Sequence, residues 1–313
     1  MTGQMGIVTN QIVIFSILMA IGFYAAKTNV LTKDALAAIS KLIVKIILPA
    51  LIFHVVAGSG VTIQDFFFSG SFALAVVFCF VFLSLCGMIM SKFCKLEGKT
   101  ANIFIALTTF SNIGFMGIPL IQSIYVEPIA QVCISVYTLV DMTLLWTYGV
   151  YLCSRHQNNS NSLNAIKNII NPTTIALFIA FIILIFGIPV PAPLMNTISG
   201  LGSTSKYLAL MYLGGALAYV KLSSILKKPS TIILAVVKML IAPIFLYYIL
   251  GFFLAQIPRT VLTLIVGLPP MTAIAMIAST YQSADEYAAE VIFVLTVASL
   301  ITIPLVSGIT NTM

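Results

Sequence analysis

The chain reads SNIGFMGIP over residues 111–119, in the middle of an apolar segment that runs from 101 to 124. A second apolar segment, 260–281, is interrupted near its middle by GLPP at residues 267–270. Glycine and proline disfavour a continuous helix, so both stretches predict breaks. In hydrocarbon such a break persists only where it is buried in protein or lines a cavity. Paired breaks in corresponding positions of two halves therefore indicate the binding site of a transporter.

The composition is that of a membrane protein. Apolar residues make up 60% of the chain and charged residues 7%, against roughly 25% charged in ordinary soluble domains. Segments of about 20 apolar residues, enough to cross a bilayer, recur along its whole length. The loops between them are too short to form a soluble domain. We predict an all-α polytopic membrane protein with ten transmembrane helices, at 7–26, 36–57, 70–91, 101–124, 129–153, 172–189, 196–219, 231–254, 260–281 and 286–309.

The loop charges predict the orientation. Lysine and arginine gather in alternate loops, so these loops should face the cytoplasm and both termini should be extracytoplasmic. We expect the cell (plasma) membrane as location and the lipid bilayer as surroundings. Because the basic residues are spread over many short loops, we expect no nucleic acid as partner. The cytoplasmic loops would carry Lys27, Lys33, Lys92, Lys95, Lys99, Arg155, Lys167, Lys221, Lys227 and Lys228, and the opposite loops only Arg259.

A polar stretch rich in Asn and Ser, 154–171, divides the chain into a first five-helix repeat, 1–153, and a second, 172–313. Because five is odd, the second set must cross the membrane in the opposite sense, as an inverted repeat requires. The broken segment is the fourth of each half. At 1.5 Å per residue, Asn112 would lie ~16 Å and Pro269 ~15 Å from opposite faces. Both breaks would then reach the midplane, where broken helices 4 and 9 could cross.

The breaks carry the chemistry expected of a substrate site. Proline frees a backbone carbonyl, glycine allows close approach, and each half-helix presents a dipole end that attracts ions. An amide side chain adds donor and acceptor groups, and a hydroxyl adds another of each. A carboxylate could be held there without a full positive charge. The predicted substrate-binding residues are Ser111, Asn112, Gly114, Pro119, Pro269 and Pro270.

Two charged residues fall inside predicted spans. Asp141 lies deep in span 129–153, and Lys238 enters span 231–254 to a comparable depth. An intramembrane carboxylate suggests a functional site, so Asp141 could bind the coupling proton. A structural ion pair with Lys238 is the alternative. With two histidines and five cysteines that form no CxxC spacing, we expect no metal and no cofactor beyond a coupling H⁺ or Na⁺.

Residues 112–120 resemble the N-x-G-[FY]-[ML]-G-x-P-[LI] signature of the auxin efflux carrier family, including its bacterial malate/malonate permease members. Weaker similarities at 21–23, 48–53 and 296–300 extend the resemblance to essentially the whole chain. It implies a ten-helix inverted-repeat fold, similar to bile acid and sodium/proton transporters, with Asn112 as substrate ligand and a homodimer as assembly. The short central loop resembles that of compact bacterial members. The second break departs from the pattern because it has no Asn beside its prolines.

The leading hypothesis is therefore a secondary transporter of a small organic anion, such as malate, malonate or another carboxylate, working by alternating access. Proton coupling and sodium coupling both fit the sequence. The alternative is a cation/proton antiporter or sodium-coupled symporter of the same architecture, although Asp141 has no acidic neighbour in sequence. A channel or receptor is a further alternative. An intramembrane enzyme is not expected, because the paired Asp or Ser–His residues that intramembrane proteases use are missing.

Overall fold

The computed structural model describes residues 2–58, 70–156, 172–219 and 229–311. These residues form helices and connections, and the only β-type pairing among them is an isolated bridge between Ser111 and Pro270. The all-α prediction is confirmed. In chain order the α-helices are α1 (Thr2–Lys27), α2 (Lys33–Leu42), α3 (Leu48–Ala57), α5 (Gly70–Phe93), α6 (Gly98–Thr109), α7 (Ile118–Ile124), α8 (Pro128–Leu144), α9 (Val150–Ser154), α11 (Pro172–Phe186), α12 (Ala192–Ser203), α13 (Ser205–Leu217), α14 (Pro229–Val236), α15 (Ala242–Leu250), α16 (Gln256–Val266), α17 (Ala273–Thr280) and α18 (Asp285–Asn311).

Wide π turns continue several of these helices: η1 (Ile43–Ile47), η2 (Ile113–Gly117), η3 (Leu145–Gly149) and η5 (Val237–Ile241). Three of them directly precede a helix with proline at its first or second position: η1 before Pro49, η2 before Pro119 and η5 before Pro243. Proline has no N–H to donate to the preceding turn, and the wider turn absorbs that loss without ending the helix. The prolines therefore modify these helices rather than stop them.

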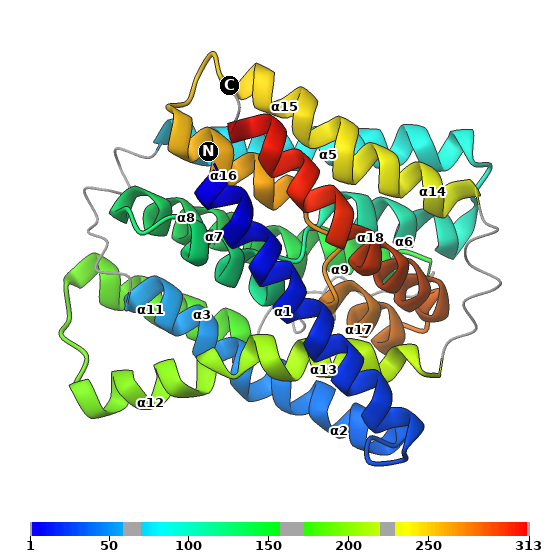
Figure 1. The fold of residues 1–313 in the computed structure, drawn as a ribbon, viewed down its shortest axis with the longest axis horizontal. Coiled ribbons are helices and arrows are strands. Elements are labelled where there is room, and N and C mark those ends of the chain that lie inside the picture. Colours follow the sequence, from blue (N-terminus) through cyan, green and yellow to red (C-terminus); the bar gives the residue numbers. More distant parts are fainter. Residues whose placement is uncertain (1, 59–69, 157–171, 220–228, 312–313) are drawn as a thin grey trace.

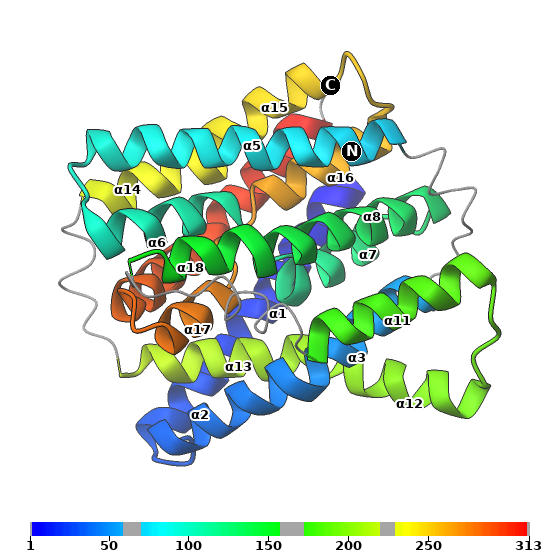
Figure 2. The ribbon, with the colours of Figure 1, turned by 180° about the vertical axis from the view of Figure 1, so that it is seen from behind.

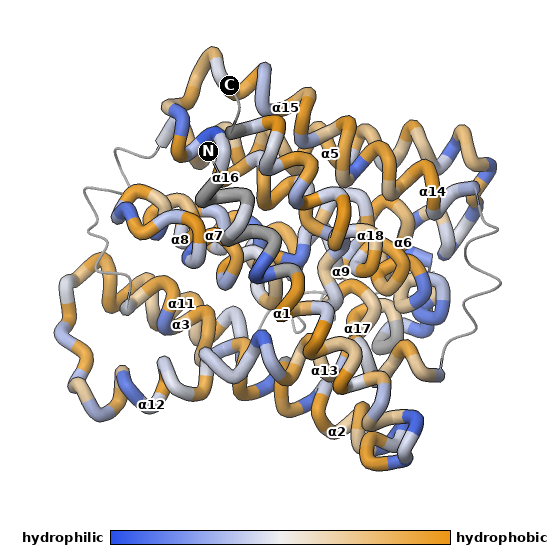
Figure 3. The backbone as a smooth tube through the Cα atoms, viewed as in Figure 1, coloured by the Kyte–Doolittle hydropathy of each residue, from blue (hydrophilic) through white to orange (hydrophobic). Residues whose placement is uncertain are grey.

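Five helices in the described part of the chain are long and apolar enough to cross a membrane: Lys33–Ala57, Gly70–Phe93, Pro128–Ser154, Pro229–Leu250 and Asp285–Thr310. Large apolar side chains of these helices, such as Leu74, Ile232 and Ile301, remain exposed, as lipid contact requires. Hydrophobic residues run along nearly all the helices, and hydrophilic ones gather near the α1–α2 and α17–α18 connections (Figure 3).

The helices lie in three tiers (Figures 1 and 2). α5, α14 and α15 form one long side, α2, α3 and α11 to α13 form the other, and α6 to α9 with α16 to α18 lie between them. α1 crosses one face of this arrangement and packs on α13. Both termini lie toward the end of the molecule that carries the α11–α12 and α15–α16 connections.

Several predicted spans are not single helices. The segment 196–219 is divided at Thr204 into α12 and α13, and 101–124 and 260–281 are interrupted as the sequence predicts. Most of the predicted connecting segment 154–171 lies outside the described residues, as do Lys167, Lys221, Lys227 and Lys228. The orientation predicted from the loop charges stays a prediction.

Candidate functional site

The first break is a short extended stretch between α6 and η2. Phe110 is extended, and Asn112 has φ −77° and ψ 63°. These angles form an inverse γ-turn, in which the N–H of Ile113 donates to the carbonyl of Ser111 at 2.8 Å. The break thus lies at 110–112, at the start of the predicted stretch 111–119. Pro119 lies at the start of α7, which continues η2, so the π turn accommodates its missing N–H.

The second break lies against the first. α16 ends before Gly267 and α17 begins at Ala273. The N–H of Asn112 donates to the carbonyl of Pro269 at 2.9 Å, and the N–H of Met271 donates to the carbonyl of Phe110 at 3.1 Å. These bonds flank the antiparallel bridge between Ser111 and Pro270. Each break therefore supplies hydrogen-bond partners that the other lost when its helix ended, as a low-dielectric interior requires.

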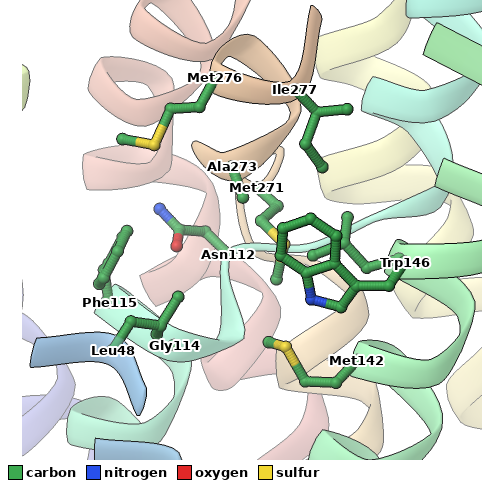
Figure 4. Close-up of a pocket in the computed structure, with 11 residues that line it drawn as sticks. Leu48, Asn112, Gly114, Phe115, Met142, Trp146, Met271, Ala273, Met276 and Ile277 are labelled. Carbon is green, nitrogen blue, oxygen red and sulfur yellow. The ribbon is translucent and has the colours of Figure 1, made fainter. Parts of the chain in front are cut away.

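Asn112 projects its side chain from this junction into a cavity (Figure 4). The side chain is buried, and its Nδ2 donates to the hydroxyl of Thr272 at 3.3 Å. Among the described residues its Oδ1 has no hydrogen-bond partner, and neither does the indole N–H of Trp146 in the same cavity wall. A buried acceptor and a buried donor without partners are costly in an apolar lining, so they mark a place where a polar ligand or water would be stabilised.

The Asn112 cavity is small, about 30 Å³, which is room for water and not for a dicarboxylate. Its other walls are apolar and come from η2, the α8–η3 helix and α17. The lining residues are Leu48, Asn112, Gly114, Phe115, Met142, Leu145, Trp146, Met271, Ala273, Met276 and Ile277. In this conformation the site is therefore closed around Asn112.

Lys238 forms hydrogen bonds with residues at the first break. It is fully buried on η5, and its Nζ donates to the carbonyl of Thr108 at 2.7 Å and to the hydroxyl of Ser111 at 3.2 Å. Thr108 lies in the last turn of α6, whose carbonyls form the negative end of the helix dipole. The ammonium group therefore occupies the place where a half-helix would attract a cation.

Asp141 is fully buried on α8, and neither carboxylate oxygen has a hydrogen-bond partner among the described residues. The buried ammonium group of Lys238 donates to the break and not to this carboxylate. Tyr137, one turn earlier on α8, is also fully buried. The structure thus places Asp141 and Lys238 in one buried region without a direct hydrogen bond between them.

Two side chains at the site were not predicted from the sequence. Thr272 supplies the partner of the Asn112 amide, and Trp146 supplies an unpaired donor. Thr272 follows Pro270 by two positions, and this closeness to the second break could have identified it as a site residue. No feature of the sequence identified Trp146 as a site residue, because aromatic residues are common in membrane spans. In the described residues, no group of three or more His, Cys, Asp and Glu side chains could hold a metal ion.

A family model described as "Membrane transport protein" matches residues 7–307 of the chain. The chain belongs to the auxin efflux carrier family. This auxin efflux carrier family member is accordingly a membrane transporter, in a family of transporters rather than enzymes. No curated protein gives a significant match to it. The motif that indicated the family, 112–120, begins at the last residue of the first break, and its residues Asn112, Gly114 and Phe115 line the cavity of this carrier.

Proposed function

We propose that this carrier is a secondary active transporter of small organic anions, such as malate, malonate or another carboxylate, across the cell membrane. The observation that supports this most is the buried Asn112 amide beside two joined helix breaks. A hydroxyl both donates and accepts, so Thr272 can partner either end of the amide. Asn112 can therefore turn its NH₂ group toward a carboxylate and keep the bond to Thr272. The start of η2 beside it adds the positive end of a helix dipole.

We infer a fold of ten transmembrane helices in two inverted five-helix repeats, 1–153 and 172–313, joined by 154–171. The interrupted α6–α7 and α16–α17 segments would be the crossing helices 4 and 9. Their mutual hydrogen bonds support this, as does the position of both termini toward one end of the molecule. Both termini would be extracytoplasmic, and alternating access would proceed around the crossover.

We propose protons rather than sodium as the coupling ion. The carbonyl of Thr108 and the hydroxyl of Ser111 are oxygen ligands of the kind that a sodium ion would use, and the ammonium group of Lys238 already occupies them. Asp141, buried and without a hydrogen-bond partner among the described residues, would take up and release the proton. The interaction between the Lys238 and Asp141 charges would link that step to the crossover.

The test is uptake of labelled malate, malonate and a monocarboxylate into proteoliposomes, with Asn112→Ala compared against the exposed control Asn196→Ala. We expect saturable uptake of at least one anion, reduced roughly tenfold or more by Asn112→Ala and unchanged by Asn196→Ala, because a hydrogen bond to a charged group is lost. Absence of saturable anion uptake would contradict the proposal. Sodium-driven proton movement without any anion would identify the antiporter alternative instead.

A further inference from the structure

A second and larger cavity, about 400 Å³, lies next to the Asn112 cavity. Gly114 lines both, so the π turn η2 separates them. The walls of the larger cavity come from α1, α3, the η2–α7 helix and the bend between α12 and α13. Many of the residues that line it are polar, unlike those of the inner cavity: they include Gln11, Gln122, Ser123, Ser203, Ser205 and Lys206.

Lys206 gives this cavity a positive charge. It is half-buried in the first turn of α13, and its Nζ lies 4.8 Å from the ring centroid of Tyr207, which also lines the cavity. No acidic residue is among the described lining residues. A cation in a concave site with low-dielectric walls concentrates anions. The cavity is therefore electrostatically suited to an anionic ligand.

Two further polar groups in the cavity wall are buried and have no hydrogen-bond partner among the described residues: the Oγ of Ser205 and the Oε1 of Gln11. Ser205 is 1% exposed. Its hydroxyl can donate to an anion, and it precedes Lys206 directly. An unsatisfied buried hydroxyl is rare and costly unless a ligand or water completes it. This observation is independent of the charge on Lys206, and it places an unpaired hydrogen-bonding group in the same wall.

The bend that carries these residues is fixed by packing. A Cβ at Gly202 would lie 2.8 Å from the Cα of Leu51, so α12 lies directly on the backbone of α3 at this point. α12 ends one residue later, and α13 begins at Ser205. Close packing at Gly202 and the restart at Ser205 together place Lys206 in the cavity wall that Pro119 and Gly114 also line.

The two cavities are adjacent, because the backbone at Gly114 lines both. Leu48 lines the inner cavity, Leu51 lines the outer one, and both lie on α3. The Cδ1 of Leu48 lies 3.3 Å from the position that a Cβ of Gly114 would occupy. Gly114 has no side chain to occupy the space between η2 and Leu48.

We propose that the larger cavity is a vestibule that binds a small carboxylate, with Lys206 and Ser205 as its ligands, before the anion passes Gly114 to reach Asn112. This rests on the proposed transport of organic anions. It adds a second binding site and identifies Lys206 as a residue that determines selectivity for anions.

Charge at the vestibule can be measured without knowing the transported anion. Ser203 is exposed and lines the cavity, so Ser203→Cys places a thiol near Lys206. We would compare how fast this thiol reacts with a sulfonate-bearing and a trimethylammonium-bearing methanethiosulfonate, using the chain without the added thiol as background. We expect Lys206→Gln to lower the ratio of anionic to cationic rates several-fold and Lys206→Arg to preserve it. An unchanged ratio in Lys206→Gln would refute the positive vestibule.

Ligand protection separates a soluble carboxylate from a lipid headgroup. We expect malonate to slow labelling of the introduced thiol in the Ser203→Cys parent, at any content of anionic lipid in the vesicles. The same concentration of malonate should give no protection when Lys206→Gln is added to that parent. Protection that follows the anionic lipid content and not malonate would assign the cavity to a headgroup and overturn the proposal.

Transport kinetics then distinguish this proposal from the function on which it rests. We expect Lys206→Gln to raise the KM for anion uptake about tenfold with a smaller change in maximal rate, since a charge-assisted contact is lost before the closed state. The exposed control Lys41→Gln should leave KM unchanged. If Asn112→Ala impairs saturable uptake and Lys206→Gln leaves KM unchanged, the vestibule fails and the carrier function stands. If neither variant affects uptake, both proposals fail.

Discussion

Individual polar atoms decide the chemistry of this carrier, because the interior around them is apolar. Within the described residues, the Asn112 amide has one partner, the Thr272 hydroxyl, and its Oδ1 has none. Lys238 satisfies the carbonyl of Thr108, while the Asp141 carboxylate has no hydrogen-bond partner in the same part of the chain. Unpaired polar atoms of this kind cost free energy in an apolar interior, so we interpret them as parts of the transport site.

The substitution Thr272→Val keeps the shape of the side chain and removes its hydroxyl. We expect a rise in KM of roughly tenfold, because the Asn112 amide loses the partner that orients it. Thr272→Ser keeps the hydroxyl and should retain transport. The measurement is the concentration dependence of anion uptake. Equal KM values for the Val and Ser variants would show that Thr272 does not orient Asn112.

At Lys238, removal of the buried ammonium should destabilise the fold. We expect Lys238→Met to cost about 3 kcal/mol, since it leaves the Thr108 carbonyl and the Asp141 carboxylate without the nearby positive charge. Asp141→Asn removes the second charge, so the double variant should lose less stability than the sum of the two single variants. Thermal unfolding of the four proteins in detergent measures this. Strict additivity would show that the two charges do not interact.

Among the helices, bare backbone makes the close crossing of α1 and α13 possible. A Cβ at Gly22 of α1 would collide with the backbone carbonyl of Met211 on α13, and a Cβ at Gly214 of α13 would collide with the carbonyl of Met19 on α1. Small residues let helices approach in this way where no water drives their association. The two glycines thus form a reciprocal contact between α1 and α13.

Gly22→Ala and Gly214→Ala should therefore destabilise the carrier, because the two helices must move apart. The control is Gly200→Ala on α12, where a Cβ would meet nothing within 4 Å. There the change should be neutral or slightly stabilising, as alanine favours a helix over glycine. We expect the melting temperature in detergent to fall for the first two variants only. A fall in the Gly200 variant of the same size would contradict this explanation.

At the scale of the whole molecule, the structure combines an accessible vestibule with a closed inner site. At the ends of α6 and α9, Lys99 donates to the carbonyl of Gln282 at 2.9 Å and Arg155 donates to Asn102 at 2.6 Å. These bonds hold α6 to α9 and to the α17–α18 connection. In the described conformation η2 separates the larger cavity from the small cavity at Asn112, as a closed-site state of the proposed alternating-access cycle would require.

The proposed transport cycle predicts which ion drives accumulation of the anion. Because Lys238 occupies the acceptors that a coupling cation would use, anion accumulation in proteoliposomes should be unchanged when choline replaces sodium. A protonophore should abolish accumulation above equilibrium, and Asp141→Asn should do the same while leaving downhill exchange of the anion. Accumulation that requires sodium and persists in the protonophore would overturn proton coupling.

Much of the site was predictable because membrane burial constrains the sequence so strongly. Charged residues are rare in the chain, so Asp141 and Lys238 were conspicuous within their spans. The two breaks were predictable from glycine and proline. The first break lies at Phe110 to Asn112, at the start of the predicted stretch, because Pro119 at its end is accommodated by a π turn. Lys206 was missed, because only the bend at Thr204 turns an apolar span into a cavity wall.

Hydrophobicity and backbone chemistry are local properties, so the amino-acid order alone predicts a helical membrane protein, its apolar segments, its two helix breaks and the family it resembles. The hydrogen bonds between the two breaks, from Asn112 to Thr272 and from Lys238 to Ser111 depend instead on how the chain folds. Each of these contacts joins residues that lie far apart in the chain. They arise because backbone groups freed in an apolar interior must find partners wherever packing brings them.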